Sequence, residues 1–182
     1  MIKYLYIFIF FFFNINSNAD NKENIINNLK NTKNFNFNFE QNINNKIEKG
    51  NCIIEYPRKI YCEYEGSIDK ILVSNGKSLV IRTKVGYYRY PLNKTPLYLI
   101  LDKKFLINNI YNLEERVIDS SLINYMIKED EYEINVFFNN KTFNLIGWQT
   151  KDIYQNLNIT FLSSIKKNEI FNKDIFKLPI QN

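Results

Sequence analysis

The chain has 182 residues, a net charge of +5 at neutral pH, two cysteines and no histidine. Its length fits a single domain. The absence of histidine excludes serine and cysteine nucleophiles that depend on an imidazole base, and it excludes imidazole metal sites. The carboxylates and lysines show no catalytic spacing, so we expect no enzyme activity, no metal and no cofactor. The lysines are dispersed rather than clustered, which argues against a nucleic-acid partner.

Residues 1–19 have the pattern of a cleaved secretory signal peptide. A short positive segment at Met1-Ile-Lys3 precedes an apolar run over residues 4–13, and small residues lead up to Ala19. The run is shorter than the about 20 residues of an ordinary transmembrane helix. We therefore expect export, cleavage after Ala19 and one mature domain over residues 20–182. An uncleaved N-terminal anchor is the alternative.

The start of the mature chain predicts one helix and one strand. Ile25, Ile26 and Leu29 recur at helical spacing and favour a helix over residues 20–34, polar on its other face. Residues 35–43 then alternate strictly, with Phe at every second position at the start, which is typical of a strand. The helix should therefore lie on a sheet rather than inside it.

Residues 50–64 predict a β-hairpin folded about Tyr56-Pro57-Arg58. If Pro57 is the centre of the turn, Ile54 faces Ile60. Side chains alternate across a strand, so one face of this hairpin is apolar and the other is mostly charged. The residues on the apolar face are Cys52, Ile54, Tyr56, Ile60, Cys62 and Tyr64.

The same pairing places Cys52 directly opposite Cys62. Directly opposite residues in a sheet have Cβ atoms about 4.5–5.5 Å apart, whereas a disulfide has a mean Cβ–Cβ separation of about 3.8 Å. A non-hydrogen-bonded pair lies at the short end of the first range, which removes most of the difference. Export and an even cysteine count favour the bond. Its loop is short, so we expect it to contribute somewhat under ~3 kcal/mol. Two reduced, buried cysteines are the alternative.

The next segment predicts three strands joined by tight turns. Residues 68–74 and 78–84 flank Asn75-Gly76, a strong hairpin signal because both central residues of that turn need positive φ. Residues 87–90 form the following strand after a turn at Val85-Gly86.

The pattern changes at Thr95-Pro96, where Thr95 can cap a helix that starts at Pro96. A helix over residues 96–102 is apolar nearly all round, and it continues or restarts through Phe105 to Ile110. Such a helix should be sandwiched between other elements or inserted into the mouth of a cavity.

After Leu122 the alternation of strands returns. The expected strands are residues 122–128, 132–138, 142–149, 156–163 and 170–178. The chain therefore predicts a mainly β (α+β) fold of about nine or ten antiparallel strands with two helices. So wide a sheet should curl. Two short helices underfill its concave side and leave an apolar cavity, as in small-molecule sites.

The expected cavity has apolar walls and a mouth at the hairpin turn. The expected wall residues are Phe37, Phe39, Ile54, Ile60, Tyr64, Leu72, Leu79, Ile81, Leu97, Leu99, Ile134 and Val136. Tyr56 and Arg58 are expected at the mouth. Ordinary core packing is the alternative for any single residue, and a one-residue slip would reverse the strands after Leu122. Asn is abundant throughout, and we give it little functional weight.

Several short motifs occur in a fixed order along the mature chain. They include Phe39-Glu-Gln41, Tyr56-Pro57, Val73-Ser-Asn-Gly-Lys77, Thr95-Pro96-Leu97 and Phe176-Lys-Leu178-Pro179. This order resembles the periplasmic lipoprotein carrier family, LolA. The resemblance implies an open, incomplete antiparallel β-barrel with a helical lid. It also implies a monomeric periplasmic carrier that holds the acyl chains of lipoproteins in an apolar cavity.

The resemblance further implies that cargo comes from an inner-membrane ATP-driven release complex, an ABC transporter, and moves toward the outer membrane. An outer-membrane receptor stays an open question. The family often has Arg immediately before the hairpin proline, whereas this chain has Tyr56 there and Arg58 two residues later. We hypothesise that Arg58 takes over the role at the cavity mouth. A secreted, solid-core β-rich interaction module is the alternative function.

Overall fold

A computed structural model describes residues 21–66, 69–118, 121–130, 132–151 and 156–181. The expected signal peptide and its cleavage site lie outside these residues and stay a prediction. In the part of the chain described, no helix is both long enough and apolar enough to cross a membrane.

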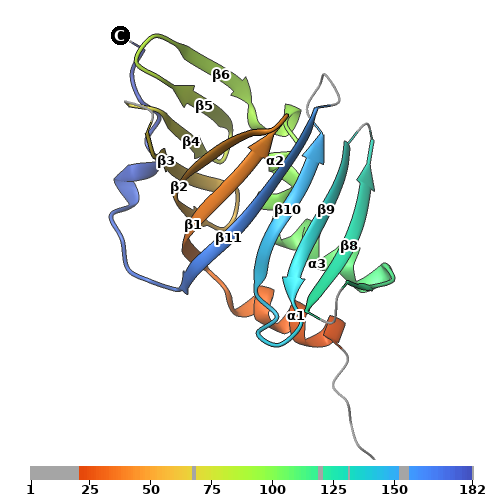
Figure 1. Cartoon of the computed structure of the whole chain (residues 1–182). Helices are drawn as coiled ribbons and strands as arrows, with labels where there is room; N and C mark the ends of the chain where they lie inside the picture. Colours follow the sequence, from red (N-terminus) through yellow and green to blue (C-terminus); the bar gives the residue numbers. More distant parts are fainter. Residues whose placement is uncertain (1–20, 67–68, 119–120, 131, 152–155, 182) are drawn as a thin grey trace, which may run out of the picture.

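Eleven strands form one antiparallel sheet in the described chain (Figure 1). Their spatial order is β6-β5-β4-β3-β2-β1-β11-β10-β9-β8-β7, so β11 returns to pair with β1, and β6 and β7 form the two edges. The strands are β1 (Asn34–Ile43), β2 (Lys46–Glu55), β3 (Lys59–Tyr64), β4 (Ile71–Asn75), β5 (Ser78–Arg82), β6 (Tyr87–Pro91), β7 (Arg116–Ile118), β8 (Leu122–Glu129), β9 (Tyr132–Asn139), β10 (Leu145–Lys151) and β11 (Leu157–Lys167). The fold is mainly β with an open, unclosed sheet, as predicted.

Three short α-helices and two 3₁₀ turns accompany the sheet in the described residues. They are α1 (Asn21–Asn31), η1 (Leu92–Lys94), α2 (Leu97–Leu101), α3 (Lys103–Asn112) and η2 (Lys173–Phe176). The apolar stripe of α1 is buried, with Ile25, Ile26 and Leu29 all in the core. Helix α1 therefore lies on the sheet, as its polar outer face requires.

The apolar helix expected after Thr95 is divided in two at Asp102. Helix α2 ends there, and the Asp102 side chain accepts a hydrogen bond from the amide of Phe105 and caps α3. Thr95 does not cap α2, because its hydroxyl donates to the carbonyl of Leu92 instead. Asp102 has an extended backbone, so α2 and α3 are separate helices, and they lie behind different parts of the sheet (Figure 1).

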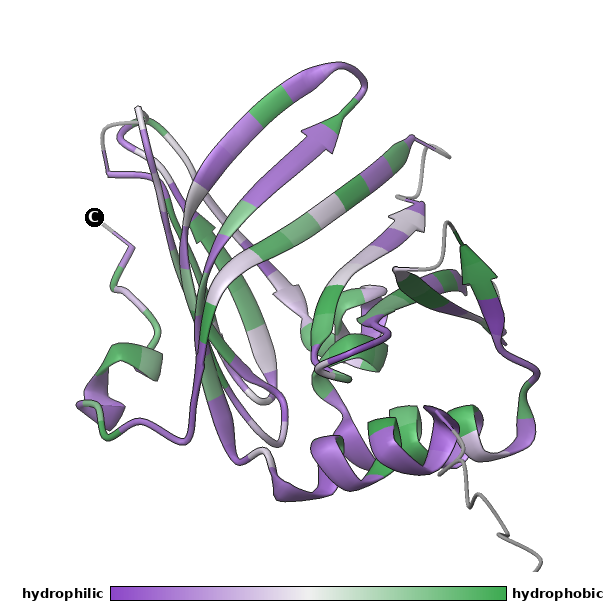
Figure 2. Ribbon diagram, turned by 60° about the horizontal axis from the view of Figure 1, so that its bottom comes forward, coloured by the Kyte–Doolittle hydropathy of each residue, from purple (hydrophilic) through white to green (hydrophobic). Residues whose placement is uncertain are grey.

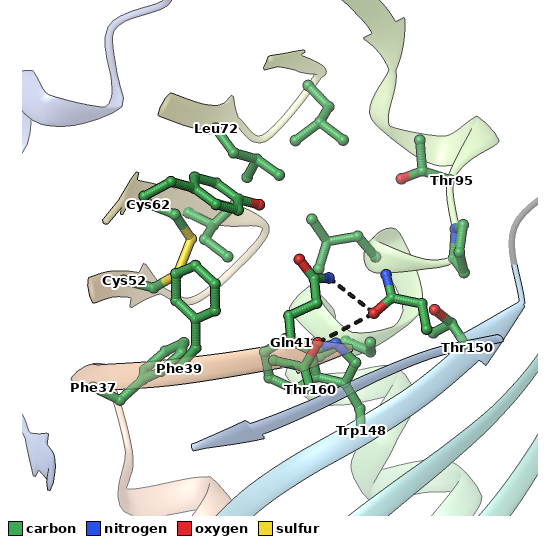
Figure 3. A pocket seen from close by; sticks show the side chains of 17 residues that line it. Phe37, Phe39, Gln41, Cys52, Cys62, Leu72, Thr95, Trp148, Thr150 and Thr160 are labelled. Carbon is green, nitrogen blue, oxygen red and sulfur yellow. Dashed lines mark hydrogen bonds between the residues drawn. A yellow bond between two sulfur atoms is a disulfide. The ribbon is translucent and has the colours of Figure 1, made fainter. Parts of the chain in front are cut away.

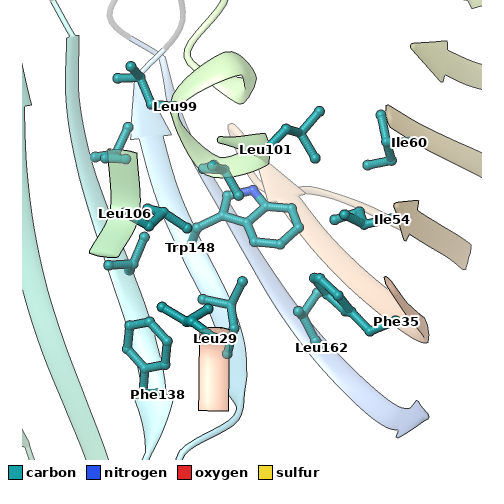
Figure 4. Close-up of a cluster of buried hydrophobic side chains, with 14 of the residues drawn as sticks. Leu29, Phe35, Ile54, Ile60, Leu99, Leu101, Leu106, Phe138, Trp148 and Leu162 are labelled. Carbon is teal, nitrogen blue, oxygen red and sulfur yellow. The ribbon is translucent and has the colours of Figure 1, made fainter. Parts of the chain in front are cut away.

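The core fills the space between the helices and the concave face of the sheet (Figure 4). Trp148 of β10 lies near its centre, among residues from the helices and the neighbouring strands. Along the strands, apolar residues alternate with polar ones, as expected when one face packs inward and the other meets water (Figure 2). Ile134 and Val136 are fully buried, so β9 presents the predicted face inward.

The hairpin of β2 and β3 has the predicted register. Cys52 pairs with Cys62, and Ile54 pairs with Ile60. The two cysteines form a disulfide with an S–S distance of 1.98 Å. All four side chains are buried on one face of the sheet.

Two further local predictions were wrong. The turn between β4 and β5 is shifted by one residue, because the Asn75 side chain accepts hydrogen bonds from the amides of Lys77 and Ser78. Only Gly76 of this turn has positive φ. The expected strand over residues 170–178 is instead an irregular segment that contains η2.

This C-terminal segment packs on the convex face of β3 and β4. Asn172 accepts a hydrogen bond from the amide of Asp174, which starts a 3₁₀ turn where the alternation predicted a strand. Phe176 is buried, and so are Val73 and Val80, which point away from the concave face. The sheet is therefore covered on both faces around β3 and β4.

Candidate functional site

A cavity of about 190 Å³ lies between the start of α2 and the concave face of the sheet (Figure 3). Its walls come from β1–β5, β10 and β11, and α2 closes it on the side opposite the sheet. The lining residues are Phe37, Phe39, Gln41, Cys52, Ile60, Cys62, Tyr64, Leu72, Leu79, Thr95, Pro96, Leu97, Ile100, Trp148, Thr150, Asn158 and Thr160. No charged side chain is among these lining residues.

One wall of the cavity is apolar and is built by neighbouring strands in register. Phe37 pairs with Cys52, Cys52 with Cys62, and Cys62 with Leu72, so these side chains form one row across four strands. The disulfide is part of this wall and ties its two central strands together.

Gly50 allows two aromatic rings of the apolar wall to meet. It pairs with Phe39 in β1 and with Tyr64 in β3, and those two rings lie edge to face with centroids 5.1 Å apart. A Cβ atom at Gly50 would lie 2.7 Å from the Phe39 ring and 2.0 Å from the carbonyl oxygen of Glu63. Glycine is therefore required here by space.

The opposite wall is polar and uncharged. It is formed by Gln41, Thr150, Asn158 and Thr160, beside the ring of Trp148 (Figure 3). Gln41 Nε2 donates a hydrogen bond of 2.9 Å to Asn158 Oδ1. The cavity thus has two chemically different sides.

The sequence predicted about half of this lining. The predicted residues that line the cavity are Phe37, Phe39, Ile60, Tyr64, Leu72, Leu79 and Leu97. The predicted residues that lie outside the lining are Ile54, Tyr56, Arg58, Ile81, Leu99, Ile134 and Val136. Most of the second group are buried in the adjoining core, whereas Ile81 is half-buried one strand beyond Leu72. Their contact with a ligand stays a prediction.

The polar wall and part of α2 were not predicted from the sequence. The residues missed are Gln41, Thr95, Pro96, Ile100, Trp148, Thr150, Asn158 and Thr160. A signal was present in the alternation, because Trp148 and Thr150 pair with Val136 and Ile134, which were expected to point inward. Residues directly opposite in a sheet share a face.

Arg58 binds the junction between α2 and α3 rather than the cavity. Its backbone amide donates to the carbonyl of Leu101 at 2.9 Å. Its guanidinium donates to Asp102 Oδ2 through Nε at 3.1 Å and through Nη2 at 2.5 Å, and it lies 4.5 Å from the centre of the Tyr98 ring. The hairpin turn and the end of α2 are therefore joined by an ion pair, which we call the Arg58–Asp102 latch.

Burial by itself would raise the pKa of Asp102, but hydrogen bonds from Arg58 and from the amide of Phe105 outweigh it. The pKa of Asp102 therefore lies below its usual value of 3.8. A carboxyl with a lowered folded-state pKa stabilises the folded state above its unfolded pKa, and this contribution is lost as pH falls through the folded value.

We therefore expect the latch to be intact throughout neutral and mildly acidic pH. The difference in unfolding free energy between the unchanged protein and Asp102→Asn should be constant from about pH 8 to pH 5 and should shrink below about pH 4. Urea unfolding at several pH values measures it. A difference that already disappears between about pH 7 and pH 5 would contradict the assignment.

Two tyrosines of the hairpin over residues 50–64 have further contacts. Lys70 donates to Glu48 at 2.6 Å and lies 4.0 Å from the centre of the Tyr64 ring, which lines the cavity. Tyr56 packs against Phe35, and its buried hydroxyl has no hydrogen-bond partner among the described residues. Burial raises the pKa of the Tyr56 hydroxyl, so it stays protonated at neutral pH.

The disulfide should contribute measurably to stability, because it closes a loop between Cys52 and Cys62 with a sequence separation of 10. Replacing both cysteines by alanine should lower the unfolding free energy by about 2–3 kcal/mol. Equilibrium unfolding in urea measures the loss. Adding a reductant to the unchanged protein is the control and should give a similar shift. Equal stability of the oxidised, reduced and double-alanine proteins would contradict the expectation.

The fold and the cavity together define an open β-sheet protein that covers an uncharged, largely apolar cavity with a short helix. The sequence profile described as "Outer membrane lipoprotein carrier protein LolA" matches residues 30–179, and the chain belongs to this family. The LolA family is periplasmic and its carriers are not enzymes. The Cys52–Cys62 disulfide is consistent with an extracytoplasmic location.

Several solved structures are similar to this chain at low sequence identity, and one of them, with a TM-score above 0.5, shows the same fold. An uncharacterised conserved protein from Thermus thermophilus superposes with a TM-score of 0.52 and 8% identity, covering 88% of this chain and 94% of that one. A LolA superfamily protein from Nitrosomonas europaea gives 0.41 and 8%, covering 80% and 90%. The lipoprotein LppX from Mycobacterium tuberculosis gives 0.46 and 13%, covering 84% and 95%. No curated protein matches the sequence significantly.

Proposed function

We propose that this chain is a periplasmic carrier that binds the acyl chains of lipoproteins in its cavity and takes them from the inner toward the outer membrane. Family membership supports lipoprotein cargo. The observation that carries the proposal is the cavity itself, whose lining holds a continuous apolar wall and no charged side chain. Acyl chains are favoured in such a site because each buried methylene contributes about 0.8 kcal/mol.

The size of the cavity indicates that the described state is closed. Its volume of about 190 Å³ is below the roughly 300–1,000 Å³ of pockets that hold drug-sized ligands. Ile100 lines the cavity and is fully buried, and Leu99 and Leu101 on the same short helix are buried too. Helix α2 is thus a lid whose own side chains fill part of the space that acyl chains would take.

Displacing this lid makes binding reversible. Acyl chains that enter the cavity become buried, whereas the apolar side chains of α2 are exposed to water. The net affinity is therefore smaller than the buried area of the acyl chains alone would give. A carrier must hold its cargo in water and still release it. We propose that the donor is an inner-membrane lipoprotein-release ABC transporter. The nature of the acceptor stays open.

Trp148 provides a direct test, because it is the only tryptophan of the chain and it lines the cavity. The mature protein is incubated with membranes that contain the release complex and a lipoprotein with brominated acyl chains. We expect a soluble complex of protein and lipoprotein in which Trp148 emission is strongly quenched, since bromine quenches only at short range.

A variant with the tryptophan moved to the convex face is the control. Phe161 is half exposed, and its ring stacks on Phe137 outside the concave core. In the double variant Trp148→Phe and Phe161→Trp, uptake should continue without quenching. If the cargo stays in the membrane and Trp148 emission is unchanged, the carrier proposal is contradicted. The alternative, a secreted interaction module without lipid cargo, would then be favoured.

A further inference from the structure

The polar wall of the cavity serves no purpose in a site for hydrocarbon alone. Thr150 and Thr160 are 6% and 3% exposed, so these hydroxyls are withdrawn from bulk water at the edge of an apolar space. Polar groups buried beside apolar surface cost free energy unless they are hydrogen-bonded. If this region were a filled core or a purely apolar cavity, valine or leucine at these positions would make the folded state more stable. Their presence therefore points to a ligand with a polar part.

The register gathers these side chains into one compact patch. Gln41 pairs with Thr160, and Asn158 pairs with Thr150, on the adjacent strands β1, β11 and β10. We call Gln41, Thr150, Asn158 and Thr160 the amide patch. It lies in the same cavity as Thr95, which directly precedes the start of the lid (Figure 3). The aromatic and disulfide wall lies on the other side of the same cavity.

Hydrogen bonds within the amide patch use only part of its capacity. Asn158 Oδ1 accepts from Gln41 Nε2 at 2.9 Å and from Thr160 Oγ1 at 3.5 Å. Among the described residues, the Asn158 amide nitrogen and the Thr150 hydroxyl have no partner of their own. Two donors are thus directed at the cavity from a patch that contains no charge.

We propose that the amide patch binds an uncharged carbonyl group, an ester or amide, at the head of an acyl chain. The inference rests on the proposed carrier function and specifies which part of the cargo is recognised besides the hydrocarbon. The Asn158 Nδ2 and Thr150 Oγ1 groups donate to the carbonyl oxygen, and the chain extends from there along Phe37 and Leu72. A carbonyl fits better than a phosphate, because the lining offers hydrogen-bond donors and no cation to neutralise an anion.

A patch of this kind discriminates by leaving its donors unpaired when the carbonyl is absent. Asn158 is half-buried and Thr150 is buried, so a ligand that covers these donors without pairing them is disfavoured more than one that merely lacks a methylene. The patch therefore fixes the depth and direction of an acyl chain, whereas the apolar wall alone would allow it to slide. Acyl chains with ester or amide linkages are thereby selected over hydrocarbon chains without them.

The test compares a short-chain glycerol diester with the diether of the same chain length, with binding read by Trp148 emission of the mature chain. The diester should bind about tenfold more tightly, as expected for one or two hydrogen bonds. Asn158→Leu and the isosteric Thr150→Val should remove the preference and leave diether affinity equal or higher. Gln149→Leu, on the neighbouring position that faces away from the cavity, is the matched control and should keep the preference.

Equal affinity of the unchanged protein for diester and diether would overturn the inference, and so would a preference that survives in both Asn158→Leu and Thr150→Val. A phospholipid with the same chains should bind no more tightly than the diester. Much tighter binding would show headgroup recognition instead and would also overturn it. If lipoprotein is taken up from membranes while the two probes bind equally, only this inference fails. If lipoprotein stays in the membrane and neither probe binds, the carrier function fails as well.

Discussion

Replacing Gly50 by alanine should lower the unfolding free energy of this protein by about 3 kcal/mol, at the upper end for an overpacked core. A Cβ atom there would lie 2.0 Å from the carbonyl oxygen of Glu63 and 2.7 Å from the Phe39 ring. The closer contact is with backbone, so relief requires β2 and β3 to separate. That movement disturbs the strands that the disulfide joins and the rings that line the cavity. Urea unfolding of the mature protein measures the loss.

Gly66 is the matched control for this substitution. It has a φ of +67°, and a Cβ atom there would meet nothing within 4 Å. Alanine at Gly66 therefore costs only the strain of the left-handed conformation, about 1–2 kcal/mol. Gly50 itself has no positive φ, so a loss at Gly50 no larger than the loss at Gly66 would show that the lack of space beneath Phe39 and Tyr64 does not make Gly50 necessary.

Replacing Arg58 by leucine should have the largest effect on cargo transfer, given the proposed function. The variant removes both hydrogen bonds to Asp102 and the contact with Tyr98, and it leaves a partly buried carboxylate unpaired. The Arg58 side chain is 38% exposed, so solvent screening weakens its ion pair with Asp102. We expect the closed position of the lid to lose about 2 kcal/mol of stability relative to the open position. The open state then gains roughly thirtyfold in population.

This shift should strengthen cargo binding and slow its release. A ligand that binds only the open state gains apparent affinity in proportion to that state's population, and such gains appear mainly in the dissociation rate. Arg58→Leu should therefore still take cargo from the release complex, with handover slowed by about the same thirtyfold. Arg58→Lys should be intermediate, because lysine keeps the charge and loses the forked geometry. The measurement is the rate at which quenched Trp148 recovers its emission when an acceptor membrane is added.

Tyr56→Phe is the control variant at the same turn. It removes a buried hydroxyl that has no partner among the described residues, so stability should be unchanged or slightly higher and release should be normal. The hypothesis for Arg58 would fail if Arg58→Leu released cargo normally while the neighbouring Tyr56→Ala abolished transfer.

The alternation of residues along the strands was enough to place the apolar wall. Phe37 and Phe39 followed from the period of β1, and the pairing about Pro57 placed Cys52 opposite Cys62. A one-residue slip would expose every side chain of such a face, so burial fixes the register strongly. The register can therefore be predicted from the sequence pattern. The periodicity also predicted a curled sheet with helices over its apolar concave side, whereas the open edge of the sheet and the lid were implied by the resemblance to the LolA family.

The polar wall was not readable in that way. Asn158 is one asparagine among many, and its position carries meaning only because β11 returns to pair with β1 and brings it beside Gln41. Strand order is set by contacts between residues far apart in the chain, which local periodicity does not encode. The expected C-terminal strand failed for a related reason, because Asn172 starts a turn and Phe176 finds its packing site on the convex face.

Local sequence therefore specified the faces of the hairpin, the disulfide pair and the apolar character of α2, since these depend on neighbours a few residues away. The long-range arrangement specified where Arg58 and Asp102 meet. The sequence suggested a side chain at the cavity mouth, whereas the structure shows a latch on the junction of α2 and α3. Such contacts depend on how helices and sheet pack together, and the free energy of that packing resides in the assembled core rather than in any one segment.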